Sequence, residues 1–110
     1  MPPITQQQLS TLLSELSLGL QQLYGPRLRG LRLYGSYATG RAAEGSDVDV
    51  AIILDDYADV WDEIQRTSQL ASRLSLQYGV SLSLIRIRER DWAARDSPLL
   101  MNLRAESLAL

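Results

Sequence analysis

The chain has 110 residues, of which 45% are apolar, and a formal net charge of −2 at pH 7. This length suits one domain with a modest core, and the apolar fraction is that of an ordinary soluble globular protein. The absence of cysteine and histidine excludes disulfides, thiol chemistry, ordinary zinc sites and Ser-His or Cys-His nucleophiles. The slight acidity argues against direct binding of long nucleic acid. No long apolar run or signal pattern is present, so we expect a soluble, cytoplasmic protein with no membrane partner.

The first predicted element is an amphipathic helix that follows a capping box formed by Thr5 and Gln8. Gly25 and Pro26 should end it after about five turns. Leucines recur at three- and four-residue spacing, and this stripe predicts core positions at Leu9, Leu12, Leu13, Leu16, Leu20 and Leu23.

Two strands, over residues 28–34 and 47–54, surround a Gly-Ser turn. We expect a short helical turn over 36–40 that Ser36 caps and Gly40 ends. A surface loop should then lead to the second strand. That strand begins with two aspartates one residue apart, Asp47 and Asp49, whose side chains should share one face because strand side chains alternate.

A second helix should begin at the cap Asp59 and end at Gly79. Its predicted apolar positions are Val60, Trp61, Ile64, Leu70, Ala71, Leu74 and Tyr78. A third strand follows over 80–88, and its arginines (Arg86, Arg88 and Arg90) are most simply a solvated edge. Ser97 and Pro98 then predict a short helix through about Arg104, before an apolar tail at 108–110 that can add an edge strand.

The aspartate pair and the Gly-Ser turn together predict phosphate chemistry. Gly35 lets a phosphate approach the main chain, while the Ser36 hydroxyl and the amides after it can donate to phosphate oxygens. Mg²⁺ held by Asp47 and Asp49 would neutralise the same phosphates. The implied reaction is nucleotidyl transfer, in which a hydroxyl attacks the α-phosphate of a nucleoside triphosphate and pyrophosphate leaves.

The order of Gly35-Ser36, a short turn and Ser46-Asp47-Val48-Asp49 resembles the nucleotidyltransferase superfamily of the DNA polymerase beta type. The chain length and element order are similar to the minimal nucleotidyltransferases (MNT proteins). This resemblance implies an α/β (α+β) fold with a small mixed sheet of three to four strands backed by helices. It implies one domain over 1–110, with a core at about 5–90 and a short C-terminal helix and tail at 91–110.

The resemblance also implies the site and its partners. Asp47 and Asp49 would be catalytic and bind Mg²⁺, and ATP would be the substrate. The residues expected to bind the nucleotide are Gly35, Ser36, Ser46 and Arg41. MNT proteins often pair with HEPN toxins, so the chain is expected to be an antitoxin that transfers AMP to a toxin tyrosine, as a hetero-oligomer or a homodimer.

Two departures from the family pattern leave alternatives open. The turn after Gly35-Ser36 lacks the basic residues that relatives often carry, and Arg41 is the nearest cation. The third acid of the superfamily is also absent, and Ser81 and Ser83 stand where it would lie. A serine cannot act as a strong base near neutral pH. The chain can therefore be an active transferase, a degenerate antitoxin that masks the toxin by binding alone, or, less in keeping with its size, a transferase for small molecules.

Overall fold

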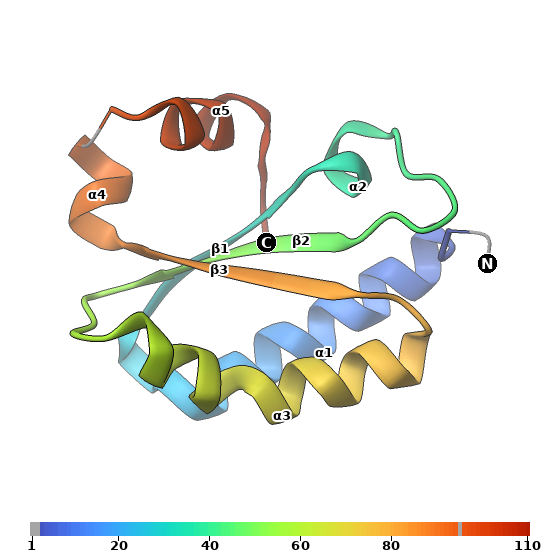
Figure 1. Ribbon diagram of the computed structural model, residues 1–110, viewed down its shortest axis with the longest axis horizontal. Coiled ribbons are helices and arrows are strands. Elements are labelled where there is room, and N and C mark those ends of the chain that lie inside the picture. The colour runs from blue at the N-terminus through green and yellow to red at the C-terminus, as the bar shows by residue number, and fades with distance from the viewer. Residues whose placement is uncertain (1–2, 95) are drawn as a thin grey trace.

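The centre of the molecule is a mixed sheet whose strands lie in the order β3-β2-β1-β4 (Figure 1). The computed structural model describes residues 3–94 and 96–110, and the bounds of the strands in these residues are Leu28–Tyr34 (β1), Val48–Leu54 (β2), Leu82–Arg88 (β3) and Leu108–Ala109 (β4). β1 is antiparallel to β2 and to β4, whereas β2 and β3 are parallel. The predicted mixed sheet is confirmed, including the edge strand in the C-terminal tail.

Two long helices, α1 (Gln6–Tyr24) and α3 (Val60–Tyr78), cover one face of the sheet (Figure 1). The predicted capping box begins α1, and Asp59 caps α3 by accepting from the backbone N–H of Trp61 at 2.9 Å. The main core lies between these helices and the sheet, and its fully enclosed side chains include Leu12, Leu16, Leu20, Val48, Val50, Ile52, Leu54 and Leu74. No helix in the described ranges is long and apolar enough to cross a membrane.

The opposite face of the sheet is covered at one end by α4 (Glu89–Ala94) and α5 (Pro98–Glu106) (Figure 1). A short 3-10 turn, η1 (Gly25–Arg27), links α1 to β1, and a four-residue helix, α2 (Ser36–Thr39), follows β1. A second, smaller core under α4 and α5 contains Ala51, Ile87, Leu100 and Leu103, with Tyr34, Ile85 and Trp92 packed against it. This cover leaves the other end of the same face, where β2 begins, for the site described below.

The prediction of which residues of the two long helices are buried is wrong in part. Leu23 of α1 is 42% exposed, and in α3 the side chains of Val60, Trp61 and Ile64 are between 38% and 60% exposed. The first half of α3 instead turns Glu63 and Thr67 toward the sheet, where they are 4% and 1% exposed. The apolar pattern misleads here because the strand beneath α3 presents a charged side chain that needs polar partners.

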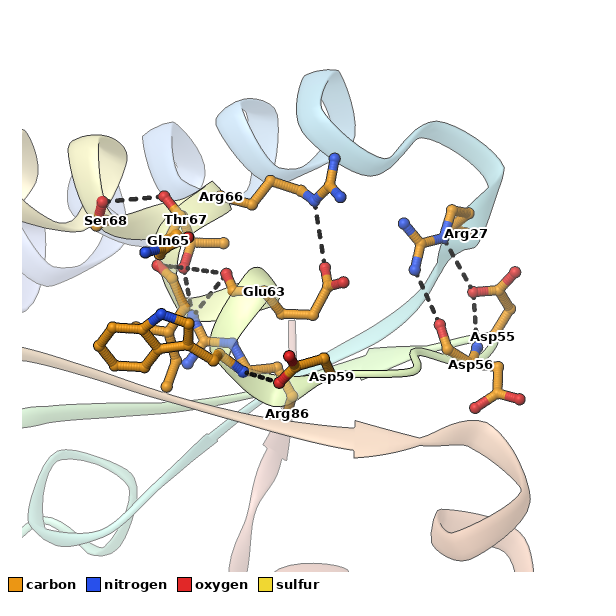
Figure 2. Close-up of polar contacts among 12 residues, drawn as sticks. Arg27, Asp55, Asp56, Asp59, Glu63, Gln65, Arg66, Thr67, Ser68 and Arg86 are labelled. Carbon is orange, nitrogen blue, oxygen red and sulfur yellow. Dashed lines mark hydrogen bonds and ion pairs between the residues drawn. The ribbon is translucent and has the colours of Figure 1, made fainter.

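That side chain is Arg86 of β3, which was expected on a solvated edge and is instead half-buried beneath α3 (Figure 2). Its guanidinium donates to the Thr67 hydroxyl, to the Glu63 carbonyl at 3.5 Å and to the Leu84 carbonyl at 2.8 Å. The Tyr57 hydroxyl donates to the Arg86 carbonyl at 3.1 Å. The side chains of Arg86 and Tyr57 therefore donate hydrogen bonds to backbone carbonyls of β3. β3 is an edge strand, and these carbonyls would otherwise be open to pairing with another chain.

Candidate active site

The two aspartates lie where β2 begins, and Asp49 is on the face of the sheet away from α1 and α3. Asp49 is half-buried within β2, because its neighbours Val48 and Val50 point into the main core and alternation turns it the other way. Asp47 is exposed and directly precedes the strand. In the sheet register Asp49 is opposite Tyr34 of β1 on one side and Ser83 of β3 on the other.

The electrostatics of this pair fit a bound cation. Burial raises the pKa of the Asp49 carboxyl, and the nearby Asp47 charge raises it further. Within the described ranges, no cationic side chain forms an ion pair with either carboxylate. Mg²⁺ is commonly held by one or two carboxylates together with substrate phosphates, so these residues fit the ion. When bound, Mg²⁺ would neutralise phosphate charge and make the α-phosphorus a better electrophile.

The Gly-Ser turn brings the main chain directly against Asp49. Gly35 has φ 73° and ψ −156°, a conformation that favours glycine. A Cβ at Gly35 would overlap the Asp49 Oδ2 and lie 3.2 Å from its Cγ. The end of β1 can therefore approach the carboxylate only because residue 35 has no side chain.

The start of α2 differs from the prediction that Ser36 caps it. Gly35 is the N-cap residue, and its carbonyl accepts from the amides of Ala38 and Thr39 at 3.1 and 3.2 Å. Ser36 is the first helical residue, so its hydroxyl is not used as a cap. The first amides of a helix have no partner inside it, and here they lie next to the Gly35–Asp49 contact. They can donate to a phosphate together with the Ser36 hydroxyl.

The other two residues expected to bind nucleotide lie in the loop between α2 and β2. The Ser46 Oγ accepts from the Ala43 amide at 2.9 Å and the Ser46 amide donates to the Ala43 carbonyl at 3.0 Å, so Ser46 closes a turn just before Asp47. Arg41 is exposed, and its backbone N–H donates to the Ser36 carbonyl at 2.9 Å. Its guanidinium has no ion pair with a described residue, which leaves it available to an incoming anion.

The two serines proposed as stand-ins for the third acid occupy different places. Ser83 is half-buried within β3, directly beside Asp49 in the parallel register. Ser81 is exposed and precedes β3, and its carbonyl accepts from the Val48 amide at 2.9 Å. The described residues contain no cluster of three acids, histidines or cysteines that could hold a metal. The third carboxylate is thus absent from the described site as well as from the sequence motif.

Tyr34 is the neighbour of Asp49 that sequence reasoning did not assign to the site. Burial raises the pKa of its hydroxyl, and the Asp49 charge adds to this effect. A signal was present in the sequence, because a hairpin that pairs residues 28–34 with the following strand brings the residue before Gly35 opposite an early position of that strand.

Comparison with known proteins confirms the predicted family. The sequence model of the nucleotidyltransferase domain matches residues 13–96. A relative from Methanocaldococcus jannaschii, provisionally named protein adenylyltransferase MJ0141, is 34% identical over 74 residues, which are 67% of this chain and 74% of that protein. The chain therefore belongs to the nucleotidyltransferase family, and the predicted enzyme class is confirmed.

Solved structures show which type of nucleotidyltransferase fold the chain has. A protein provisionally described as a minimal nucleotidyltransferase superposes with a TM-score of 0.55 at 24% identity, covering 92% of this chain and 90% of that one. A chain from the complex of a tri-AMPylated HEPN toxin with an MNT antitoxin, from Shewanella oneidensis, superposes with a TM-score of 0.50 at 20% identity. That match covers 88% of this chain and 68% of the other. The chain has the minimal nucleotidyltransferase fold, as predicted.

Proposed function

We propose that the chain transfers AMP from Mg-ATP to a tyrosine hydroxyl of a HEPN toxin, and so acts as its antitoxin in the cytoplasm. The contact between Gly35 and Asp49 carries this proposal, because it sets amide donors for phosphates directly against a carboxylate suited to a divalent cation. The relative named as a protein adenylyltransferase and the structural match to an AMPylated toxin complex support the same activity.

In the proposed site, Asp47 and Asp49 hold Mg²⁺, and Gly35, Ser36, Ser46 and Arg41 hold the triphosphate. The acceptor hydroxyl oxygen forms a bond to the α-phosphorus. The bond between that phosphorus and the oxygen that bridges to the β-phosphate breaks, and its electron pair leaves with pyrophosphate. The proton of the acceptor hydroxyl passes to water, and AMP stays attached to the acceptor through a phosphodiester bond.

The experiment mixes the chain with the product of the neighbouring gene, α-labelled ATP and Mg²⁺. Label transfer that disappears in the Asp47→Ala, Asp49→Ala variant is the expected result. Glu106→Gln, an exposed change on α5 away from the site, is the matched control and should transfer label normally. A tight complex with no label transfer by the unaltered chain would overturn the proposal. A thermal shift with millimolar ATP should depend on Mg²⁺.

A second function, neutralisation of the toxin by binding alone, is favoured by one observation. Ser83 occupies the position beside Asp49 where the superfamily has an acid, and a serine cannot supply its charge. Loss of a positioned general base costs on the order of a hundredfold in rate or more. Under this alternative, the Asp47→Ala, Asp49→Ala variant would bind and silence the partner as well as the unaltered chain does.

A further inference from the structure

A hollow of about 270 Å³ lies beside Asp47, at the end of the sheet where β2 and β3 begin. The polar part of the hollow is formed by Glu44, Ser46, Asp47 and Ser81, and Ile4, Tyr37 and Val80 contribute apolar surface. These apolar residues also pack against the main core, so this wall of the hollow continues the interior of the protein.

Hydrogen bonds between segments far apart in the sequence fix the walls of the hollow. The Tyr37 hydroxyl accepts from the Ile4 amide at 3.2 Å, which ties the segment before α1 to α2. The Ser81 carbonyl accepts from the Val48 amide at 2.9 Å, which holds the starts of β2 and β3 together. The hollow is therefore formed before any ligand arrives.

We propose that this hollow receives the acceptor side chain, a tyrosine of the partner protein, with its ring against the apolar wall and its hydroxyl toward Asp47 and Ser81. This inference rests on the proposed function. The sheet order supports it, because the Gly35 turn follows β1, the aspartates begin β2, and Ser81 precedes β3. Attacking and leaving oxygens lie roughly in line across a transferring phosphorus. With the leaving phosphates on the Gly35 side, the acceptor enters from the β3 side.

The size and lining of the hollow favour a side chain over the nucleotide. Pockets for whole small molecules run from about 300 to 1,000 Å³, whereas a water molecule takes up about 30 Å³ in the liquid. A volume near 270 Å³ thus suits one aromatic side chain rather than a nucleoside triphosphate. A tyrosine has an apolar ring and one polar end, and the hollow offers an apolar wall and a polar part in the same way.

In the resulting step the phenol oxygen forms the new bond to the α-phosphorus of ATP. The bond from that phosphorus to the bridging oxygen breaks, and the electron pair leaves with pyrophosphate. The phenolic proton passes to water at the mouth of the hollow. The Asp47 carboxylate orients the hydroxyl by accepting from it, and the Ser81 hydroxyl does so by accepting from it or donating to it.

Amide NMR on the whole chain tests the site, with N-acetyl-tyrosinamide as the probe, in Mg²⁺ and a non-hydrolysable ATP analogue. We expect shifts centred on Ser46, Gly79 and Ser81, and much smaller shifts with the phenylalanine amide, which lacks the hydroxyl. Ala43→Trp places bulk in the hollow and should weaken the tyrosinamide at least tenfold. Ala105→Trp on the exposed side of α5 is the matched control and should leave binding unchanged.

Three results would overturn the inference: no shift at these amides with millimolar tyrosinamide, equal shifts with the phenylalanine amide, or a hollow already filled by the ATP analogue. In the transfer assay, Ala43→Trp should raise the KM for the partner. In the separate thermal-shift measurement, the same variant should still show the Mg-dependent shift with ATP. If Ala43→Trp and the unaltered chain transfer AMP equally well, the hollow is not the acceptor site, but the proposed AMP transfer still holds. If the unaltered chain binds tyrosinamide in the hollow but transfers no AMP, the proposed function is wrong, although the hollow does bind a tyrosine side chain.

Discussion

Gly35 and Asp49 are in such close contact that any side chain at position 35 would displace the Asp49 carboxylate. A Cβ there would lie 3.2 Å from the Asp49 Cγ and overlap its Oδ2. The same glycine has a positive φ of 73°. Two separate features of position 35 therefore favour glycine. Its backbone conformation is one that residues with a side chain disfavour, and a side chain there would take the space of the Asp49 carboxylate.

The effect of the backbone conformation and the effect of the contact with Asp49 can be separated by comparing Gly35→Ala with Gly25→Ala. Gly25 also has a positive φ, of 56°, but a Cβ there would meet nothing within 4 Å. Both variants should lose about 1–3 kcal/mol of unfolding free energy from backbone strain. Only Gly35→Ala should also displace Asp49 and abolish the Mg-dependent thermal shift with ATP. Equal ATP shifts in the two variants would show that the contact with Asp49 has no part in binding.

The raised pKa of Asp49 makes stability depend on pH in the absence of metal. Because its folded-state pKa lies above the unfolded value, the stability it contributes is complete below the unfolded pKa and is lost as pH rises through the folded one. In EDTA, Asp49→Asn should therefore gain unfolding free energy over the unaltered chain as pH rises from about 4.

Urea unfolding from pH 3 to pH 8 measures the Asp49 effect. Asp47→Asn, which changes the exposed partner, should give a smaller gain, and Mg²⁺ should reduce both differences. An Asp49→Asn variant less stable than the unaltered chain at pH 7 in EDTA would contradict this account.

Much of the fold follows from local sequence signals. The capping box at Thr5, the cap at Asp59 and the left-handed Gly79 set the helix ends that the sequence predicts. The alternation of apolar residues in 47–54 correctly turns Asp49 to the face away from the main core. These features depend on neighbours in the chain, which is why a single sequence is enough to find them.

The errors occur where tertiary contacts decide. The helix pattern places Val60 and Ile64 inward, but Arg86 lies below α3 and draws Glu63 and Thr67 there instead. No local spacing reveals that pairing, because about twenty residues separate its members. The site shows the same limit: the motif predicts its carboxylates, whereas the hollow beside Asp47 depends on Ile4 meeting Tyr37.

Ser83→Asp should restore the charge that the superfamily places beside Asp49. In EDTA the added carboxylate should lower stability, because it introduces a like charge next to Asp49. With Mg-ATP it should tighten ion binding and raise the rate of AMP transfer by up to about a hundredfold if the new acid acts as a base. Ser83→Asn, which has the same shape without the charge, is the control. Faster transfer by both variants would rule out a charge effect.

Arg86 provides the sharpest test of the polar contacts beneath α3 (Figure 2). Arg86→Met should cost on the order of 2–4 kcal/mol, because it removes hydrogen bonds and one of the two positive charges near the Glu63 carboxylate. That carboxylate, whose side chain is 6% exposed, would keep its ion pair with Arg66 at 3.4 Å. Arg90→Met is the matched control, since the Arg90 side chain is 71% exposed and should cost under about 0.5 kcal/mol. Urea unfolding gives both values.

A second variant shows which loss dominates. If the buried charge is the larger cost, adding Glu63→Gln to Arg86→Met should recover part of the lost stability. If the uncovered Leu84 carbonyl matters more, Arg86→Met should instead self-associate through the β3 edge, and gel filtration would show dimers or larger species. Arg86→Met with unchanged stability and a monomeric elution would mean that neither the charge of Arg86 nor its bond to the Leu84 carbonyl contributes.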